Sequence, residues 1–237
     1  MSHCYFVSDL HLFANRSEAH RYLEAIERAA GRAKTFVLGG DIFDFRWATL
    51  ASIGHAVDEA ARWLAELAAD CPKTQFHFLL GNHDYHQGFI DRLGTLKQQT
   101  PNLDWHRFYF RQGGNVFIHG DVADRKTSAE MLASQRARWL HRRKRGPMMS
   151  RLYDLVVMAH LHRPVPYFVY RRRTVAKRIL AYLRGIGQGP EHGVRHVYFG
   201  HIHRPMSHYH YGGLTYHNGG APIKGTKFRI VEVAPGG

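Results

Sequence analysis

Five short clusters of aspartate, asparagine and histidine are spread along the sequence, and each one directly follows an apolar run. The clusters are Asp9-Leu10-His11, Gly40-Asp41-Ile42-Phe43-Asp44, Gly81-Asn82-His83-Asp84, His119-Gly120-Asp121 and Gly200-His201-Ile202-His203. Carboxylate, amide and imidazole groups without thiolates favour Mn²⁺, iron or Zn²⁺ over softer metals. Asp41 is the natural residue to bridge two such ions. The pattern therefore predicts a metal centre.

Each cluster has a simpler explanation when it is taken alone. A single histidine such as His11 or His119 is usually a packed core or surface residue, and Asp84 is a common turn residue. A metal centre is favoured because all five clusters occupy the same kind of position. Open α/β sheets collect their functional residues at the carboxyl ends of strands, so we expect the clusters to converge there.

The hydrophobic pattern between the clusters predicts the elements that position them. Its order is β-α-β-α-β-α followed mostly by strands, which is typical of an α/β fold. Asn15-x-x-Glu18 predicts a capping box at the start of a helix that ends before Gly31. Two more helices are predicted over residues 50–69 and 88–96. Later strands are predicted over residues 105–110 and 116–119, as a hairpin around residues 112–115, and over residues 197–199, 208–211, 214–217 and 228–233.

Length and composition limit the classes of protein to which the chain can belong. The 237 residues suffice for one large α/β domain, and a hydrophobic content of 44% indicates a globular core. Cys4 and Cys71 lie beside apolar runs, so we expect buried thiols in a reducing cytoplasm rather than a disulfide framework. Asp9 comes too early to leave room for a signal peptide, and no apolar run approaches the roughly 18 residues of a membrane span. The sequence therefore predicts a cytoplasmic protein.

The net charge of +14 is concentrated in one segment. Residues 125–184 contain sixteen of the 33 Lys and Arg residues and only two acidic residues, Glu130 and Asp154, so the rest of the chain is formally neutral. Helices are predicted within it over residues 128–144 and 175–186. We interpret residues from about 125 to 192 as a basic helical insertion in a single domain spanning residues 1–237. Its partner would be nucleic acid, an anionic membrane surface or a phosphorylated substrate, and a solvated basic face is the simpler alternative.

Taken in order, the five clusters resemble the motifs of the calcineurin-like metallophosphoesterases, and they extend over nearly the whole chain. The resemblance implies a four-layer α-β-β-α sandwich with mixed sheets. It also implies two divalent metal ions about 3.5–4 Å apart that activate water for attack on phosphorus. The implied ligands are Asp9, His11, Asp41 and His203 for one ion and Asp41, Asn82, His119 and His201 for the other.

His83 need not bind metal in this arrangement, because Asn82 takes the ligand role. We expect His83 to stabilise the phosphoryl oxygens or to protonate the leaving group, with Asp84 orienting its ring. Asp44 is expected behind the ligands or in a turn.

A near-duplicate of the last cluster precedes it in the chain. Ala159-His160-Leu161-His162 also follows an apolar run and is also followed by Arg-Pro. We favour Gly200-His201-Ile202-His203 as the ligand-bearing copy, because a glycine can take the backbone conformation that a sharp turn after a strand demands and an alanine resists it.

The basic insertion is similar to that of the UDP-diacylglucosamine pyrophosphohydrolases of lipid A synthesis, where an insertion forms a lid over an acyl chamber. This resemblance implies a nucleotide-linked lipid such as UDP-diacylglucosamine as substrate, Mn²⁺ as the metal, with iron or zinc as alternatives, and peripheral contact at the inner membrane face. That branch carries arginine where this chain has His83, so the chain is a relative of those hydrolases rather than one of them. The expected substrate-binding residues are Arg46, Arg125, Arg171, Arg172 and Lys177.

Two other functions stay open. A nuclease or cyclic-nucleotide phosphodiesterase would also use the basic residues, but the aromatic residues available for stacking on bases are few, so nucleic acid is the less favoured partner. A metal-free scaffold that binds protein would have lost ligands, whereas every expected ligand position is filled here. The sequence carries no signal of oligomeric state.

Overall fold

The computed structural model describes residues 3–144 and 170–235, and two five-stranded sheets lie at its centre. The first sheet has the order β10-β1-β2-β3-β4, with β1 (Cys4–Val7), β2 (Thr35–Leu38), β3 (Gln75–Leu79), β4 (Leu103–His106) and β10 (Val231–Glu232). The second has the order β5-β6-β7-β9-β8, with β5 (Tyr109–Gln112), β6 (Asn115–Ile118), β7 (His196–Phe199), β8 (Met206–Tyr211) and β9 (Leu214–Asn218). Both sheets are mixed. Strands β1 to β4 run parallel, as do β6, β7 and β9, and the antiparallel pairs are β1 with β10, β5 with β6 and β8 with β9.

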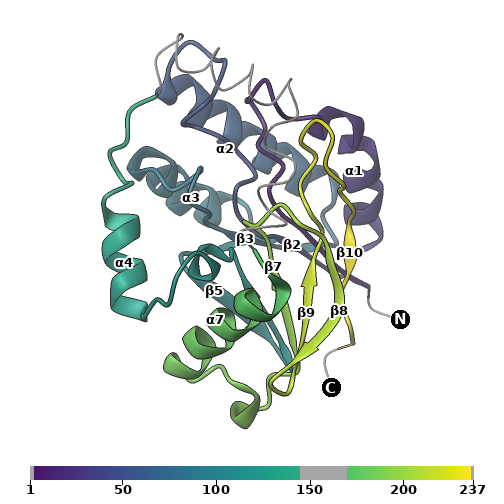
Figure 1. Ribbon diagram of the computed structural model, residues 1–237. Helices are drawn as coiled ribbons and strands as arrows, with labels where there is room; N and C mark the ends of the chain where they lie inside the picture. The colour runs from purple at the N-terminus through teal and green to yellow at the C-terminus, as the bar shows by residue number, and fades with distance from the viewer. Residues whose placement is uncertain (1–2, 145–169, 236–237) are drawn as a thin grey trace.

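Helices cover the outer faces of both sheets (Figure 1). The first sheet carries α1 (Leu23–Arg32), α2 (Ile53–Asp70) and α3 (Gln87–Gln99), and the second carries α7 (Arg172–Gly185). A further helix, α4 (Ala129–Ala137), lies beside them, and short 3₁₀ turns occur at η1 (Ala19–Arg21), η2 (Asp121–Ala123) and η3 (Pro190–His192). Within residues 3–144 and 170–235, none of these helices is both long and apolar enough to cross a bilayer.

Three apolar layers hold the elements together. Phe36, Phe76 and Phe78 pack with the helices of the first sheet, and an equivalent cluster joins α7 to the second sheet. Between the sheets, Phe6 packs against Phe117 and Tyr198, all three fully buried. Helices, sheet, sheet and helices therefore follow one another, and the predicted α/β fold with mixed sheets is confirmed.

The predicted capping box at Asn15 is wrong. Helix α1 begins only at Leu23, its N-cap Tyr22 makes no side-chain cap, and Gly31 lies inside the helix. The reason is tertiary: Ala14 and Ser17 form isolated β-bridges with distant residues, which holds this stretch out of a helix. The backbone N–H of Glu18, which a capping box at Asn15 would use, donates instead to the carbonyl of Pro222.

The predicted strand over residues 105–110 belongs to two different sheets. Trp105 pairs within β4 of the first sheet, whereas Tyr109 begins β5 of the second. No glycine or proline lies between Trp105 and Phe110, so the sequence contains no turn residue that marks the crossing between the sheets. The hairpin itself, β5 with β6, lies where it was predicted.

The other predicted elements differ from the observed ones mainly at their ends. Ser128 is the N-cap of α4 as expected, but the helix stops at Ala137 instead of Lys144. Ser52 caps α2 and accepts a hydrogen bond from the N–H of His55. The last predicted strand shortens to two residues in β10.

Candidate active site

The loops that follow β1, β2, β3, β6 and β7 bring the five clusters together at one end of the two sheets. Backbone hydrogen bonds join neighbouring loops, from Asp9 N to Gly40 O (3.0 Å) and from Gly200 N to His119 O (2.7 Å). Side chains link the two sheets, because both oxygens of Asp9 accept the backbone N–H of His201, at 2.8 and 3.0 Å. The parallel register thus positions residues from distant parts of the sequence within one site.

The backbone of the site is held in an unusual conformation. Seven non-glycine residues of the described chain have positive φ, and five of them are predicted metal ligands. These are Asp9 (55°), His11 (48°), Asp41 (52°), His201 (67°) and His203 (51°). Such left-handed residues cost free energy and persist only where the surrounding structure fixes them, often at functional sites.

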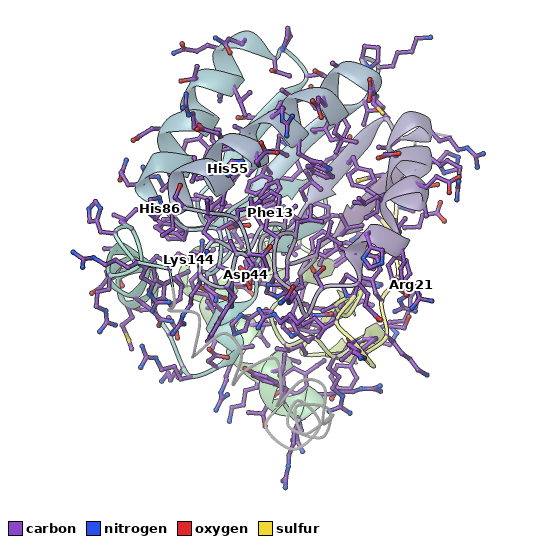
Figure 2. All side chains as sticks on the ribbon, turned by 90° about the horizontal axis from the view of Figure 1, so that it is seen from above. Phe13, Arg21, Asp44, His55, His86 and Lys144 are labelled. Atoms are coloured by element: carbon purple, nitrogen blue, oxygen red, sulfur yellow. The ribbon has the colours of Figure 1, made fainter. Side chains whose placement is uncertain are left out.

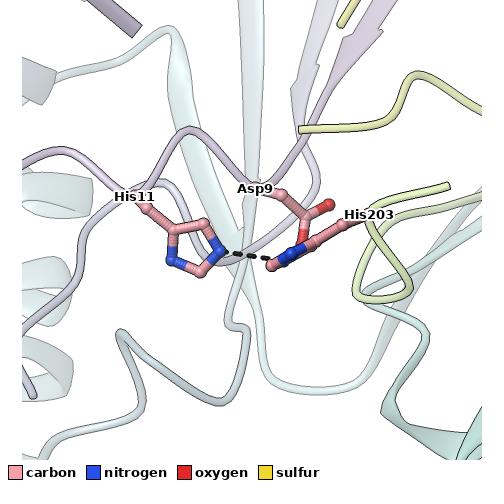
Figure 3. Close-up of side chains that lie close together, drawn as sticks. All are labelled: Asp9, His11 and His203. Atoms are coloured by element: carbon pink, nitrogen blue, oxygen red, sulfur yellow. Dashed lines mark hydrogen bonds and ion pairs between the residues drawn. The ribbon is translucent and has the colours of Figure 1, made fainter. Parts of the chain in front are cut away.

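One group of possible metal ligands consists of Asp9, His11 and His203 (Figure 3). The Nε2 atoms of His11 and His203 lie 3.0 Å apart, and Nε2 of His203 lies 3.5 Å from Oδ1 of Asp9. Asp9 and His11 are fully buried, whereas the side chain of His203 is 24% exposed. Two of the three side chains are therefore shielded from solvent, and the third is accessible to it.

A second group consists of Asp41, His119 and His201, together with Asn82. Nε2 of His119 lies 3.4 Å from Oδ2 of Asp41 and 3.1 Å from Oδ1 of Asn82. The same Asn82 oxygen lies 2.9 Å from Nδ1 of His201. One amide oxygen, one carboxylate and two imidazoles thus converge.

Asp41 lies between the two groups. Besides its place beside His119, it can share an ion with His11 and His83, since one ligand atom from each of these three lies within 4.8 Å of the others. Ligand atoms about 2.0–2.2 Å from a tetrahedral ion are about 3.3–3.6 Å apart, close to the separations seen here. The donor set and its spacing therefore fit divalent metal ions.

The buried charges of the site depend on one another. Burial acts to raise the pKa of Asp41, but the facing His119 and His83 rings hold it well below its usual range. Burial acts to lower the pKa of His119, but Asp41 raises it to about 10. Without a metal ion the Asp41–His119 pair therefore retains a proton. A cation that binds here must displace that proton, so its affinity should fall at low pH.

Asp44 supports the site from behind. Its Oδ2 accepts a hydrogen bond from Arg16 at 2.8 Å and lies 3.4 Å from Nδ1 of His11. Its Oδ1 accepts the backbone N–H groups of Arg46 and Trp47. Figure 2 shows Asp44 near the middle of the face seen from above. The prediction that Asp44 lies behind the ligands or in a turn agrees with both sets of contacts.

The predicted pairing of Asp84 with His83 is wrong. The Asp84 carboxylate accepts backbone N–H groups from Gly81 (2.6 Å) and Ile42 (3.0 Å), so it ties two loops together instead. Burial and the neighbouring Asp41 raise the pKa of Asp84 to about 8. The carboxylate beside His83 is Asp44, whose Oδ1 lies 2.9 Å from His83 Nδ1 as an ion-pair contact rather than an aligned hydrogen bond.

Two supporting groups were not predicted from the sequence. Oδ1 of Asp124 lies 2.8 Å from Nε2 of His201 and accepts a hydrogen bond from the Tyr170 hydroxyl at 2.7 Å. Arg136 is fully buried and forms a two-point ion pair with Asp121, at 2.9 and 3.0 Å. No sequence spacing marks Arg136 as special, because it resembles the many exposed cations around it.

The predicted substrate-binding residues separate into two sets. Arg46 lines a small pocket that also includes Asn82 and His83 at the site. Arg125 instead donates a hydrogen bond to Gln135. Arg171, Arg172 and Lys177 are exposed at and near the start of α7. The same small pocket contains two further cations, Arg142 and Arg143, which were not predicted as substrate contacts.

The copy of the histidine motif at residues 200–203 contributes to the site, whereas the copy at residues 159–162 lies outside the described residues. Gly200 does not have the backbone conformation that was predicted for it. Its φ is not positive, and the left-handed residues are His201 and His203. A Cβ atom at Gly200 would instead collide with the side chains of Asp9 and Ser8. Close approach of the loops, rather than a turn conformation, requires the glycine.

Several known proteins are similar to this chain. The model of the calcineurin-like phosphoesterase family matches residues 3–205. The UDP-2,3-diacylglucosamine hydrolases of Pseudomonas paraeruginosa and Nitrosococcus oceani are each 28% identical to this chain, over 222 and 228 residues. The alignments cover 86% of this chain in both cases and 82% and 80% of those proteins. A solved structure of a dimetal phosphatase from Danio rerio is 13% identical, with a TM-score of 0.46, covering 94% of this chain and 88% of that one.

The chain therefore belongs to the calcineurin-like phosphoesterase family, and it is a metal-dependent phosphoester hydrolase. The predicted class of enzyme is confirmed.

Proposed function

We propose that this protein is a dinuclear-metal hydrolase that cleaves a pyrophosphate or phosphodiester bond in a nucleotide-linked lipid such as UDP-diacylglucosamine. The observation that carries the proposal is the convergence of two ligand groups on Asp41. Relatives named UDP-2,3-diacylglucosamine hydrolase support the substrate class. A role in lipid A synthesis is proposed from the resemblance of the sequence motifs and the basic insertion.

Seven residues would hold the two ions. Asp9, His11 and His203 would serve one ion and Asn82, His119 and His201 the other, with Asp41 shared. We propose Mn²⁺ as the bound metal, because a donor set of oxygens and imidazoles accepts this ion. Among the metals that such a site accepts, the supply of each metal decides which one is bound. The bound ions would polarise the phosphoryl oxygens and lower the pKa of a bound water.

His83 is the residue best suited to assist the reaction. Its side chain is 15% exposed, so it can reach substrate from the rim of the site. Oδ1 of Asp44 lies 2.9 Å from its Nδ1 and orients the ring, which would bind a phosphoryl oxygen or give a proton to the leaving group. Asp44, not Asp84, is therefore the positioning residue for His83.

The pocket beside His83 suits a second phosphate. Arg46, Arg142 and Arg143 line it, and guanidinium groups bind phosphate oxygens through paired N–H donors. Phe45 and Trp139 also line it and supply apolar surface. A substrate with two linked phosphates would use both the metal centre and these cations, whereas a simple monoester would use only the former.

Both described parts of the basic segment adjoin the site. The backbone N–H of Gln87 donates to the carbonyl of Leu140, and Lys144 Nζ donates to the carbonyl of Leu50. Residues that follow α4 therefore lie against the start of α3, close to His83 in the sequence, and against the segment before α2. Arg178 of α7 donates to the carbonyls of Ala123 and Asp124 behind His201. We propose that the segment captures the lipid substrate and contacts anionic membrane at the cytoplasmic face.

The proposal is tested by a turnover panel with Mn²⁺ present. Its substrates are a nucleotide-linked glycolipid, an aryl phosphomonoester, an aryl phosphodiester, a cyclic nucleotide and single-stranded DNA. We expect the glycolipid to be preferred, and the double variant Arg142→Ala with Arg143→Ala to raise KM for it alone. The exposed Arg138→Ala serves as control. Preference for DNA or a cyclic nucleotide would contradict the proposed substrate and favour the nuclease or phosphodiesterase function.

A further inference from the structure

A third group of possible metal ligands lies outside the candidate active site, on β3 and β4. The strand register sets His77 directly opposite Asp104, and His106 lies two residues further along the same face. One ligand atom from each of these residues lies within 4.8 Å of the others. Nδ1 of His77 and Nε2 of His106 are 3.1 Å apart.

The rings are held in place by the second sheet. Phe110 of β5 stacks on His77 and His106, with ring centroids 3.8 Å and 4.9 Å apart. Both histidines are half-buried, and β4 is the edge strand of its sheet, so the group is open to solvent from one side. A preorganised group with solvent access is what a metal site on a sheet edge requires.

The carboxylate of Asp104 has one oxygen available for a cation. Lys97 Nζ and the backbone N–H of Trp105 both bind Oδ1 of Asp104, at 2.7 and 2.8 Å. Within the described chain these interactions use one carboxylate oxygen, which leaves Oδ2 for a metal ion.

We propose that His77, Asp104 and His106 form an additional site for Zn²⁺ or a related divalent transition ion. Two imidazoles and one carboxylate are a common donor set for such ions. The nitrogen separation of 3.1 Å is close to the roughly 3.3 Å between neighbouring ligands of a tetrahedral zinc ion.

The site is separate from the dinuclear centre. His77 lies within β3, whereas Asn82 lies in the loop that follows the end of this strand at Leu79, and the two groups share no ligand. An ion here would connect β3 to the edge strand β4, so its role would be structural rather than catalytic. The inference does not depend on the proposed substrate.

Metal counting tests the site. The full chain is treated with chelator, dialysed to equilibrium against Zn²⁺ and analysed for zinc per chain, and Co²⁺ absorption reports the ligand field. The variants are Asp104→Asn and His106→Gln. The matched control is His196→Ala, because His196 also faces a histidine, His217, at 3.3 Å but has no carboxylate in the arrangement described here.

We expect each site variant to bind one ion fewer per chain than the wild type and the control, with a changed Co²⁺ spectrum and unchanged turnover of an aryl phosphoester. Equal zinc counts in the wild type and Asp104→Asn would overturn the proposal. Asp104→Asn decides the outcome if His106→Gln fails to fold, because it replaces one oxygen of a half-buried side chain. Loss of turnover with normal zinc counts would instead concern the proposed function.

Discussion

His83 is the residue whose role most clearly separates catalysis from metal binding. It can share an ion with His11 and Asp41 by distance, yet its Nδ1 lies beside Asp44. We predict that His83→Ala retains the wild-type number of metal ions and loses turnover by roughly 10²–10⁴-fold, the contribution of a general acid or base. Metal analysis and aryl phosphoester turnover measure both effects.

His86→Ala is the matched control for this prediction, since His86 lines the same pocket as His83 but belongs to the N-cap of α3. It should leave aryl phosphoester turnover close to that of the wild type. If His83→Ala loses an ion, His83 is a ligand and the role of Asn82 must be reassigned.

At the level of elements, Arg136 joins α4 to the site. It pairs with Asp121, donates to the carbonyls of Leu80 and Arg107, and lies between two aromatic rings. Its replacement leaves a buried carboxylate without its partner, which costs about 3–5 kcal/mol. We predict that Arg136→Met lowers the free energy of unfolding by that amount in denaturant titration. A change no larger than that of the exposed Arg138→Met would show that the ion pair does not anchor α4.

Helix α7 offers a test of the substrate-capturing role. Arg171, Arg172, Arg173 and Lys177 are exposed, whereas Arg178 is bound to backbone carbonyls and must be kept. Reversing the four exposed charges to Glu should slow hydrolysis of a long-chain nucleotide-linked lipid and spare a small aryl phosphoester. The reason is that attraction to anionic lipid contributes about 1 kcal/mol per cation.

The control for α7 is reversal of two exposed arginines on helices of the opposite layer, Arg62 and Arg92. Their replacement by Glu should affect neither substrate. Equal activity of the α7 variant on both substrates would reject the capturing role and leave α7 as a solvated basic face.

At the scale of the whole molecule, some features can be predicted from the sequence and others cannot. Strand ends and ligand types are visible in the sequence because the apolar runs before Asp9, Asp41 and Asn82 directly precede polar residues. The crossing between sheets after His106 is hidden, because no glycine or proline marks it. The positions of Asp44 and Asp84 are hidden as well, since both carboxylates follow the same kind of loop and only the folded backbone decides which one faces His83.

The interface between the sheets should make the protein sensitive to acid. Burial and the neighbouring His208 and His196 lower the pKa of His217 to about 4, below its ordinary value near 6.5. The unfolded chain therefore binds more protons than the folded one between these values, so stability is lost as the pH falls from about 6.5 to about 4. We predict that Tm falls over this range, and falls less in His217→Phe, which retains stacking on Tyr198. Parallel Tm curves for the two proteins would contradict this assignment.

Asp41 is the proposed shared ligand of two metal ions. The decisive measurement is elemental analysis of the wild type and Asp41→Ala, purified without chelator and assayed with an aryl phosphoester. We predict that the variant contains two ions fewer per chain and has lost turnover, because Asp41 lies with His119 and His201 on one side and with His11 on the other and is the proposed ligand of both ions. An unchanged number of ions in Asp41→Ala would contradict a dinuclear centre bridged by Asp41.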